Sequence, residues 1–256
     1  MRGFFPVYGK EMYRIFASPI FYVVAFIFLT LAGYFFYSAV AYYSLLSFQA
    51  GRSPFLAEQL NLSEMVLEPF FGSVGIVLLL MVPLITMRLF AEEKKTGTVE
   101  LLLTYPLSDR GVVLGKYTAA LSIVALMLTG TLPAMVVLNV LSTLPWSTLF
   151  SCYLGLFLMS SAFVSLGVLA SSLTQNQIIA AAVTFGALLL LWIIGWAQTL
   201  AGPDVGRVLV YLSLLSHFES FTKGVLDSRD ILYYGLFVTV CLFTTLRILE
   251  SRHWRA

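Results

Sequence analysis

One long stretch without charge constrains this sequence more than any other feature. No Asp, Glu, Lys or Arg occurs from residue 117 to residue 203, a run of 87 positions. A transmembrane helix needs about 20 apolar residues, so this run has room for three spans. Its only polar clusters, at residues 142–147 and 171–177, consist mainly of Ser, Thr, Pro, Asn and Gln and are typical of short turns between spans. The solvent for this part of the chain must be lipid.

Three further uncharged runs occur at residues 15–51, 69–87 and 231–246, and each can hold one more span. The last run is short and requires Arg247 to extend its side chain towards the interface. The sequence therefore predicts an all-α polytopic membrane protein that forms a single transmembrane domain over residues 1–256. The six expected spans cover roughly residues 20–43, 70–87, 117–141, 148–171, 178–200 and 231–249.

Composition agrees with this fold class and limits the partners. Hydrophobic residues make up 59% of the 256 positions and charged residues only 11%, against roughly 25% charged residues in soluble domains. A net charge of +2 excludes a nucleic-acid partner, because phosphate binding requires a dense basic face. Cys152 and Cys241 lie in apolar runs without metal or redox spacing, so we interpret both as packing residues.

The distribution of Lys and Arg predicts the orientation. Eleven Lys and Arg residues flank the expected spans on the side of the two termini. The opposite side has four Lys and Arg residues and seven acidic residues. Because positive charge accumulates on the cytoplasmic side, both termini are expected in the cytoplasm of a cell with this protein in its inner membrane.

Residues 1–18 precede the first span. Apolar Phe5, Tyr8 and Met12 recur at helical spacing, while Lys10, Glu11 and Arg14 fall elsewhere on the helical wheel. This pattern predicts an amphipathic helix that lies in the inner interface. A frayed basic tail is the alternative.

The first outer segment, residues 44–68, is expected to be a loop. Glu64 and Glu68 are four positions apart and would share one helix face. A solvated acidic face is the favoured interpretation, and a cation site is the alternative.

The cytoplasmic segment 88–116 joins the second and third spans. Gly97 interrupts its charged part, Thr98 can cap a helix and Pro106 must end one, so a short helix is expected over residues 99–104. Three successive leucines, residues 101–103, give that helix apolar faces towards its own bundle and away from it. Such a helix can dock into the groove of a partner; an ordinary loop between spans is the alternative.

The outer segment 204–230 precedes the last span. Residues 208–215 are nearly all apolar but too few to cross the membrane, so the segment is expected to dip into the outer leaflet and return. Gly224 would end its second arm and Asp230 would cap the sixth span. A surface loop covered by a partner, such as an accessory protein on the outer side, is the competing interpretation.

Groups for catalysis are scarce. His217 with Glu219 could form a site, but a hydrogen-bonded interfacial histidine is the better interpretation. The string from Gly111 to Tyr117 is not a phosphate-binding loop, because only three residues separate its glycines and Tyr117 replaces the Ser or Thr that would hold magnesium. The expected span interiors also lack ionisable residues, which disfavours ion-coupled transport. Energy for any transport would therefore come from outside the chain, through segment 88–116.

Two strings resemble a known family. Residues 92–108, Glu-Glu-Lys-Lys-Thr-Gly-Thr-Val-Glu-Leu-Leu-Leu-Thr-Tyr-Pro-Leu-Ser, followed by Val113-Leu114-Gly115-Lys116, resemble the cytoplasmic segment of type-2 ABC exporter permeases. Residues 216–234 resemble the outer stretch before the last span in the gliding-motility (GldF-like) branch. The resemblance extends over the whole chain in the number and order of spans.

The resemblance implies an interfacial connector helix, six spans, a coupling helix on a separate ATPase subunit and an outer re-entrant hairpin before the sixth span. Two permease copies, identical or different, would join two ATPases; ATP and magnesium would be bound by the ATPases and no cofactor by this chain. Residues implied to contact or position the ATPase are Glu92, Glu93, Thr96, Gly97, Thr98 and Glu100. The residues expected in the outer hairpin are His217, Phe218, Glu219, Gly224 and Asp230. A membrane scaffold that transports nothing and an intramembrane enzyme remain as alternatives.

Overall fold

The computed structural model describes residues 3–50, 61–97, 108–142, 145–199 and 202–253. Within these ranges all regular structure is helical. Six helical segments are long and apolar enough to cross a membrane, which confirms the predicted fold class. They cover Pro19–Ala50, Ser63–Lys95, Asp109–Val140, Trp146–Leu173, Gln177–Ala197 and Ser228–Ser251.

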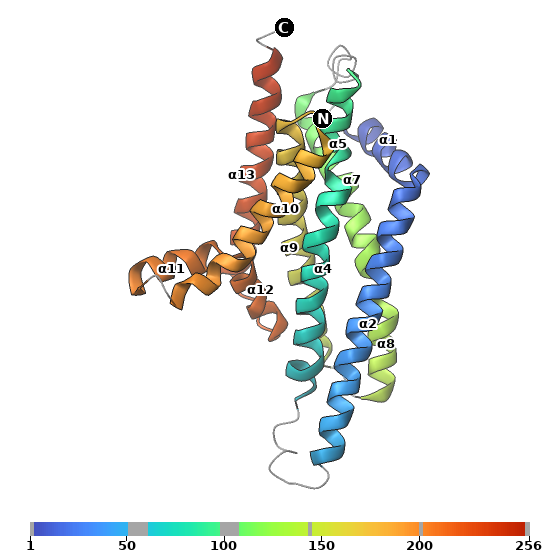
Figure 1. The fold of residues 1–256 in the computed structure, drawn as a ribbon, viewed down its shortest axis with the longest axis vertical. Helices are drawn as coiled ribbons and strands as arrows, with labels where there is room; N and C mark the ends of the chain where they lie inside the picture. The colour runs from blue at the N-terminus through green and yellow to red at the C-terminus, as the bar shows by residue number, and fades with distance from the viewer. Residues whose placement is uncertain (1–2, 51–60, 98–107, 143–144, 200–201, 254–256) are drawn as a thin grey trace.

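The first half of the chain contributes three of these spans. Helix α1 (Phe4–Ala17) lies at an angle to α2 (Pro19–Ala50), and Ser18 with extended backbone joins them (Figure 1). The second span consists of a π-helical turn η1 (Ser63–Leu67), α4 (Glu68–Thr86) and α5 (Arg88–Lys95). The third contains α7 (Asp109–Thr129) and α8 (Leu132–Leu141). Helix α2 continues to Ala50, beyond the expected end at residue 43, because no Gly, Pro or charge interrupts residues 44–50.

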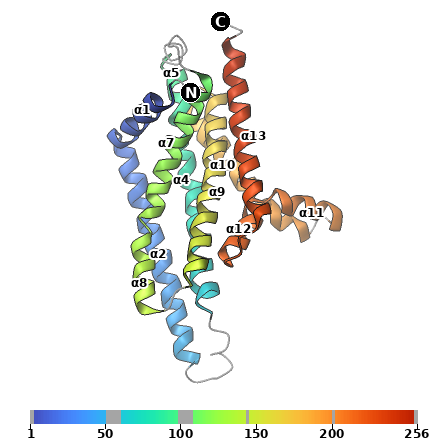
Figure 2. The ribbon, with the colours of Figure 1, turned by 180° about the vertical axis from the view of Figure 1, so that it is seen from behind.

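The second half contributes the other three spans. Helix α9 (Trp146–Leu173) is followed by α10 (Gln177–Ile193), which ends in the 3₁₀ turn η2 (Ile194–Thr199). Two short helices follow: α11 (Pro203–Leu212) projects from the side of the bundle, and α12 (Leu214–Thr222) returns to pack against α9 before α13 (Ser228–His253) (Figures 1 and 2). The N- and C-terminal ends of the chain lie at the same end of the molecule (Figure 1).

Helix α9 forms the centre of the bundle and packs against α4, α7, α10, α12 and α13. Small residues allow this close packing. A Cβ on Gly155 would overlap the ring of Phe221 on α12, and a Cβ on Gly167 would overlap Thr86 on α4. Both cysteines, predicted as packing residues, are buried, and so are the serines Ser160, Ser161 and Ser165 of α9.

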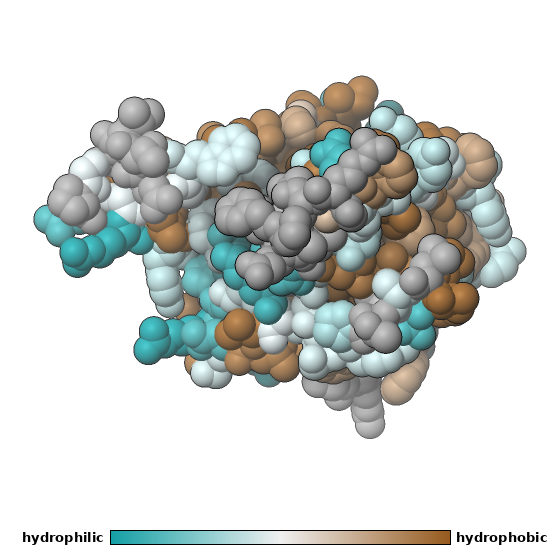
Figure 3. Space-filling model, turned by 90° about the horizontal axis from the view of Figure 1, so that it is seen from below, coloured by the Kyte–Doolittle hydropathy of each residue, from teal (hydrophilic) through white to brown (hydrophobic). Residues whose placement is uncertain are grey.

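The outer flanks are apolar, as a lipid environment requires. Only 17% of the most hydrophobic window of α2, and the same share in α13, is buried inside the molecule. The exposed side chains on these two helices include Phe26, Tyr37, Leu232 and Leu236. In the view along the bundle, hydrophobic residues cover much of the flank (Figure 3). The chain therefore presents its apolar surface outwards rather than only inwards.

Candidate functional site

The candidate site lies where the second span ends and leads into the segment between α5 and α7. Helix α4 contains Pro83, which has no backbone N–H, and α4 gives way to α5 at Met87. Ser171 of α9 inserts its hydroxyl at this joint: its Oγ accepts from the N–H groups of Phe90 and Ala91 at 3.0 and 3.1 Å. The same hydroxyl donates to the carbonyl of Met87 at 3.0 Å. A side chain from the central helix therefore fixes the direction in which α5 leaves the span.

A buried lysine joins three helices at this level. Lys116 of α7 is completely buried, and its Nζ lies 2.5 Å from Glu11 Oε1 on α1 and 2.9 Å from Glu93 Oε2 on α5. It also donates to the carbonyl of Leu89 at 2.7 Å. Because a buried charge without a partner costs several kcal/mol, these carboxylates and this ammonium group require one another.

Two further ion pairs lie around this centre. Lys10 Nζ is 3.1 Å from Glu93 Oε1, and Arg14 is 2.6 Å from Glu92 Oε2. Burial opposes the charge on Arg14, but Glu92 and Glu11 outweigh this effect and raise the pKa of its guanidinium. We call the whole set the coupling cluster; it consists of Lys10, Glu11, Arg14, Glu92, Glu93 and Lys116.

The coupling cluster has three positive and three negative side chains, so its formal charge is zero. Its members come from α5 and α7, which flank one segment of the chain, and from α1, which lies far from both in the sequence. At Gly115, a Cβ would lie 3.0 Å from the side chain of Val7, so α1 rests directly on the start of α7. The cluster and this close contact hold the three helices together at the base of the segment between α5 and α7.

The predicted coupling residues lie at and beyond the end of α5. Glu93 is buried in the coupling cluster and Glu92 is half-buried at its rim. Thr96 ends α5 and donates its hydroxyl to the carbonyl of Glu92 at 3.0 Å, and Gly97 has a φ of +71° that favours glycine. Thr98, Glu100 and the expected helix over residues 99–104 lie outside the described residues. On the far side, Ser108 caps α7 and accepts from the N–H of Gly111 at 3.2 Å.

The sequence did not identify Lys10, Glu11, Arg14 or Lys116 as site residues. It predicted an amphipathic helix with Lys10, Glu11 and Arg14 off the apolar face, and the structure adds which side faces the protein: Glu11 is buried, whereas Phe5 and Tyr13 are 80% and 79% exposed. In a bilayer the apolar side of such a helix can face lipid, and its acid finds its partner inside the protein. The available signal was Lys116 itself, a lysine next to the start of an uncharged run.

A second polar cluster lies where the hairpin of α11 and α12 meets α13. His217 of α12 places its Nδ1 2.6 Å from Asp230 Oδ1 and its Nε2 3.0 Å from the carbonyl of Tyr211. Its ring stacks on Tyr233, with 3.9 Å between ring centroids. We call these four residues the hairpin cluster. His217 is thus hydrogen-bonded, as the sequence analysis predicted.

Two expectations for the hairpin need correction or refinement. Asp230 does not cap the last span, because α13 begins at Ser228 and Asp227 accepts the N–H of Arg229. Asp230 instead pairs with His217, while Glu219 is exposed and is not the partner of the histidine. Gly224 follows the end of α12 with a φ of +79°, in agreement with its expected role, and Phe218 is buried.

The described residues contain no group of three His, Cys, Asp or Glu side chains that could hold a metal ion. The fold and this arrangement define a polytopic α-helical membrane protein in which buried charged residues join helices. Residues 5–248 match the family described as ABC-2 family transporter protein, and the chain belongs to that family. It is therefore a membrane component of a transporter, and the family works with an ABC ATPase subunit. A search of curated proteins gives no match to this chain.

Proposed function

We propose that this chain is the permease subunit of an ABC exporter and that it couples ATP hydrolysis by a separate ATPase to movement of a substrate across the membrane. The observation that carries the proposal is the coupling cluster, which joins α1, α5 and α7 at both anchors of the segment 96–108. A push on this segment would move the second and third spans and the first helix as one unit. The buried ion pairs would resist any separate movement of these three helices.

The proposed assembly contains two permease copies and two ATPases that bind ATP and magnesium. Glu92 and Glu93 act in it by positioning α5, since both side chains are engaged within the chain. Thr96 and Gly97 are exposed and adjoin the surface that meets the ATPase. Both termini and this surface lie in the cytoplasm, and the outer hairpin lies on the other side. The GldF-like branch remains a prediction that rests on residues 216–234.

The test uses the rim pair of the coupling cluster, because a change at the fully buried Lys116 would lower stability and coupling together. The variant Glu92→Arg places two cations together, and the double variant Arg14→Glu with Glu92→Arg restores an ion pair with reversed direction. With the partner ATPase in proteoliposomes, we expect Glu92→Arg to lower permease-dependent ATP turnover several-fold and the double variant to recover most of it.

A matched control is the exposed pair Arg247–Glu250 on α13, which also lies at the end of the termini, with 2.7 Å between its atoms. Reversing Glu250 to Arg should leave ATP turnover unchanged. Loss of turnover in both the single and the double variant at Glu92 would mean that Glu92 touches the ATPase directly. ATP turnover that does not depend on the permease in any form would contradict the proposed function.

A further inference from the structure

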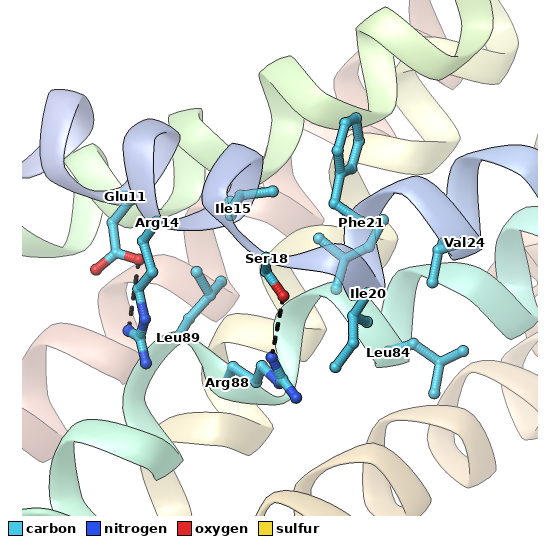
Figure 4. Close-up of a pocket in the computed structure, with 11 residues that line it drawn as sticks. Glu11, Arg14, Ile15, Ser18, Ile20, Phe21, Val24, Leu84, Arg88 and Leu89 are labelled. Atoms are coloured by element: carbon cyan, nitrogen blue, oxygen red, sulfur yellow. Dashed lines mark hydrogen bonds and ion pairs between the residues drawn. The ribbon is translucent and has the colours of Figure 1, made fainter.

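A pocket opens beside the coupling cluster, at the corner between α1, α2 and the joint of α4 with α5. Its cavity volume is about 70 Å³, and it widens at its mouth into open space. Polar side chains line one side and apolar side chains the other (Figure 4). The polar lining consists of Glu11, Arg14, Ser18 and Arg88.

Arg88 is the unusual member of this lining. Its guanidinium faces Ser18 across the pocket, but the distance from its Nη1 to Ser18 Oγ is 3.5 Å, at the limit of a hydrogen bond (Figure 4). Its Nε is buried and has no hydrogen-bond partner. Among the residues that the structure describes, no carboxylate forms an ion pair with Arg88. Burying a guanidinium without an ion-pair partner costs free energy, and an anion bound to it would offset that cost.

The neighbouring charges do not supply that anion. Glu11 is bound to Lys116 and lies 3.8 Å from Arg14, and Arg14 is bound to Glu92. Glu93 is held between Lys10 and Lys116. Because the coupling cluster is neutral as a whole, Arg88 leaves this corner of the molecule with one uncompensated positive charge.

The position of the pocket indicates where its anion comes from. Ser18 directly precedes the first span, and Arg88 begins α5 just after the joint at Met87. At the mouth, Ile20 is 38% exposed and Leu84 is 40% exposed, and both belong to the apolar flank of the bundle. The pocket therefore lies at the boundary between the apolar spans and the polar end that carries both termini. At this depth in a membrane, the anions next to an apolar surface are the phosphates of lipid headgroups.

We propose that this pocket binds the phosphate of a phospholipid from the leaflet on the side of the two termini, with Arg88 as the anion-binding group. The guanidinium donates to the phosphate oxygens, as its planar fork allows, and Ser18 offers its hydroxyl beside it. The acyl chains lie along Ile20 and Leu84. The bound lipid joins the elbow between α1 and α2 to the joint between α4 and α5, next to the coupling cluster. An anionic lipid binds more tightly than a zwitterionic one, because the pocket carries net positive charge.

The test is native mass spectrometry of the purified full chain, titrated with dioleoylphosphatidylglycerol or dioleoylphosphatidylcholine. We expect the wild type to bind phosphatidylglycerol about tenfold more tightly than Arg88→Gln does, since a charge-assisted pair to phosphate is lost. In neutral detergent without anionic lipid, Arg88→Gln should melt at or above the wild-type temperature. Added phosphatidylglycerol should raise the melting temperature of the wild type only.

Two further variants separate this site from general attraction. Arg247→Gln removes one positive charge at the same end of the molecule but outside the pocket, and it should bind phosphatidylglycerol like the wild type. Ile20→Trp fills the mouth without changing the charge and should weaken lipid binding as Arg88→Gln does. Equal binding by wild type and Arg88→Gln, or an equal loss in Arg247→Gln, would overturn the proposal. Displacement of the lipid by millimolar inorganic phosphate would assign the site to free anions and would also overturn it.

Discussion

The two polar clusters of this protein differ in the interactions that hold them together and in the helices that they join. The coupling cluster joins α1 to α5 and α7 through full charges, with a completely buried lysine at its centre. The hairpin cluster joins neighbouring elements through one imidazole, one carboxylate and an aromatic stack. The buried ion pairs of the coupling cluster must form or break together, because removing one ion leaves its partners buried without a counter-charge. The coupling cluster therefore suits a joint that transmits movement, and the hairpin cluster suits a local brace.

The comparison predicts its largest effect at Lys116. Replacement by Met leaves Glu11 and Glu93 buried without their shared partner, so we expect the free energy of unfolding in detergent to fall by about 3–5 kcal/mol. Lys95→Met, on the exposed side of the same region, is the control and should change little. Equal stability of the two variants would show that the centre of the coupling cluster is not a stabilising contact.

The hairpin cluster should give a smaller loss. His217→Ala removes the partner of Asp230 and the stack on Tyr233, and we expect a loss of about 2 kcal/mol in the same denaturation assay. The effect should be local, with greater protease sensitivity at residues 203–222 and no change in permease-dependent ATP turnover. If His217→Ala lowers permease-dependent ATP turnover as much as Glu92→Arg does, the two clusters do not differ in their role in coupling.

The rim of the coupling cluster should give the smallest effect on stability. Arg14→Gln breaks a partly exposed ion pair with Glu92, and such pairs contribute less than about 1 kcal/mol. Its effect on ATP turnover should nevertheless exceed that of His217→Ala, because it loosens α1 from α5. The two variants should therefore differ in opposite ways. His217→Ala should cause the larger loss of stability, and Arg14→Gln should cause the larger loss of permease-dependent ATP turnover.

The sequence predicts the spans well because length and missing charge are local properties. The uncharged run at residues 117–203 contains the helices α8, α9 and α10 and most of α7, and its polar turns lie between them. The break at Ser18, between α1 and α2, also follows from a local signal, since Pro19 begins the first span.

The ion pairs could not be predicted in the same way. Nothing in the pattern of residues 4–17 states that Glu11 meets Lys116, because that contact depends on how α1 crosses α7. The same applies to Asp230, whose position suits a helix cap by local rules but whose side chain faces His217 in the folded chain. The roles of Thr98, Glu100 and the helix over residues 99–104 remain predictions from the sequence.

The most direct measurement is site-specific photo-crosslinking at position 96, which is exposed at the end of α5. A photoreactive amino acid there should yield an adduct with an ABC ATPase subunit in membranes, while the same group at the exposed position 226, between α12 and α13, should not. An adduct with the ATPase from position 226, or none from position 96 in an intact transporter, would contradict the proposed coupling route.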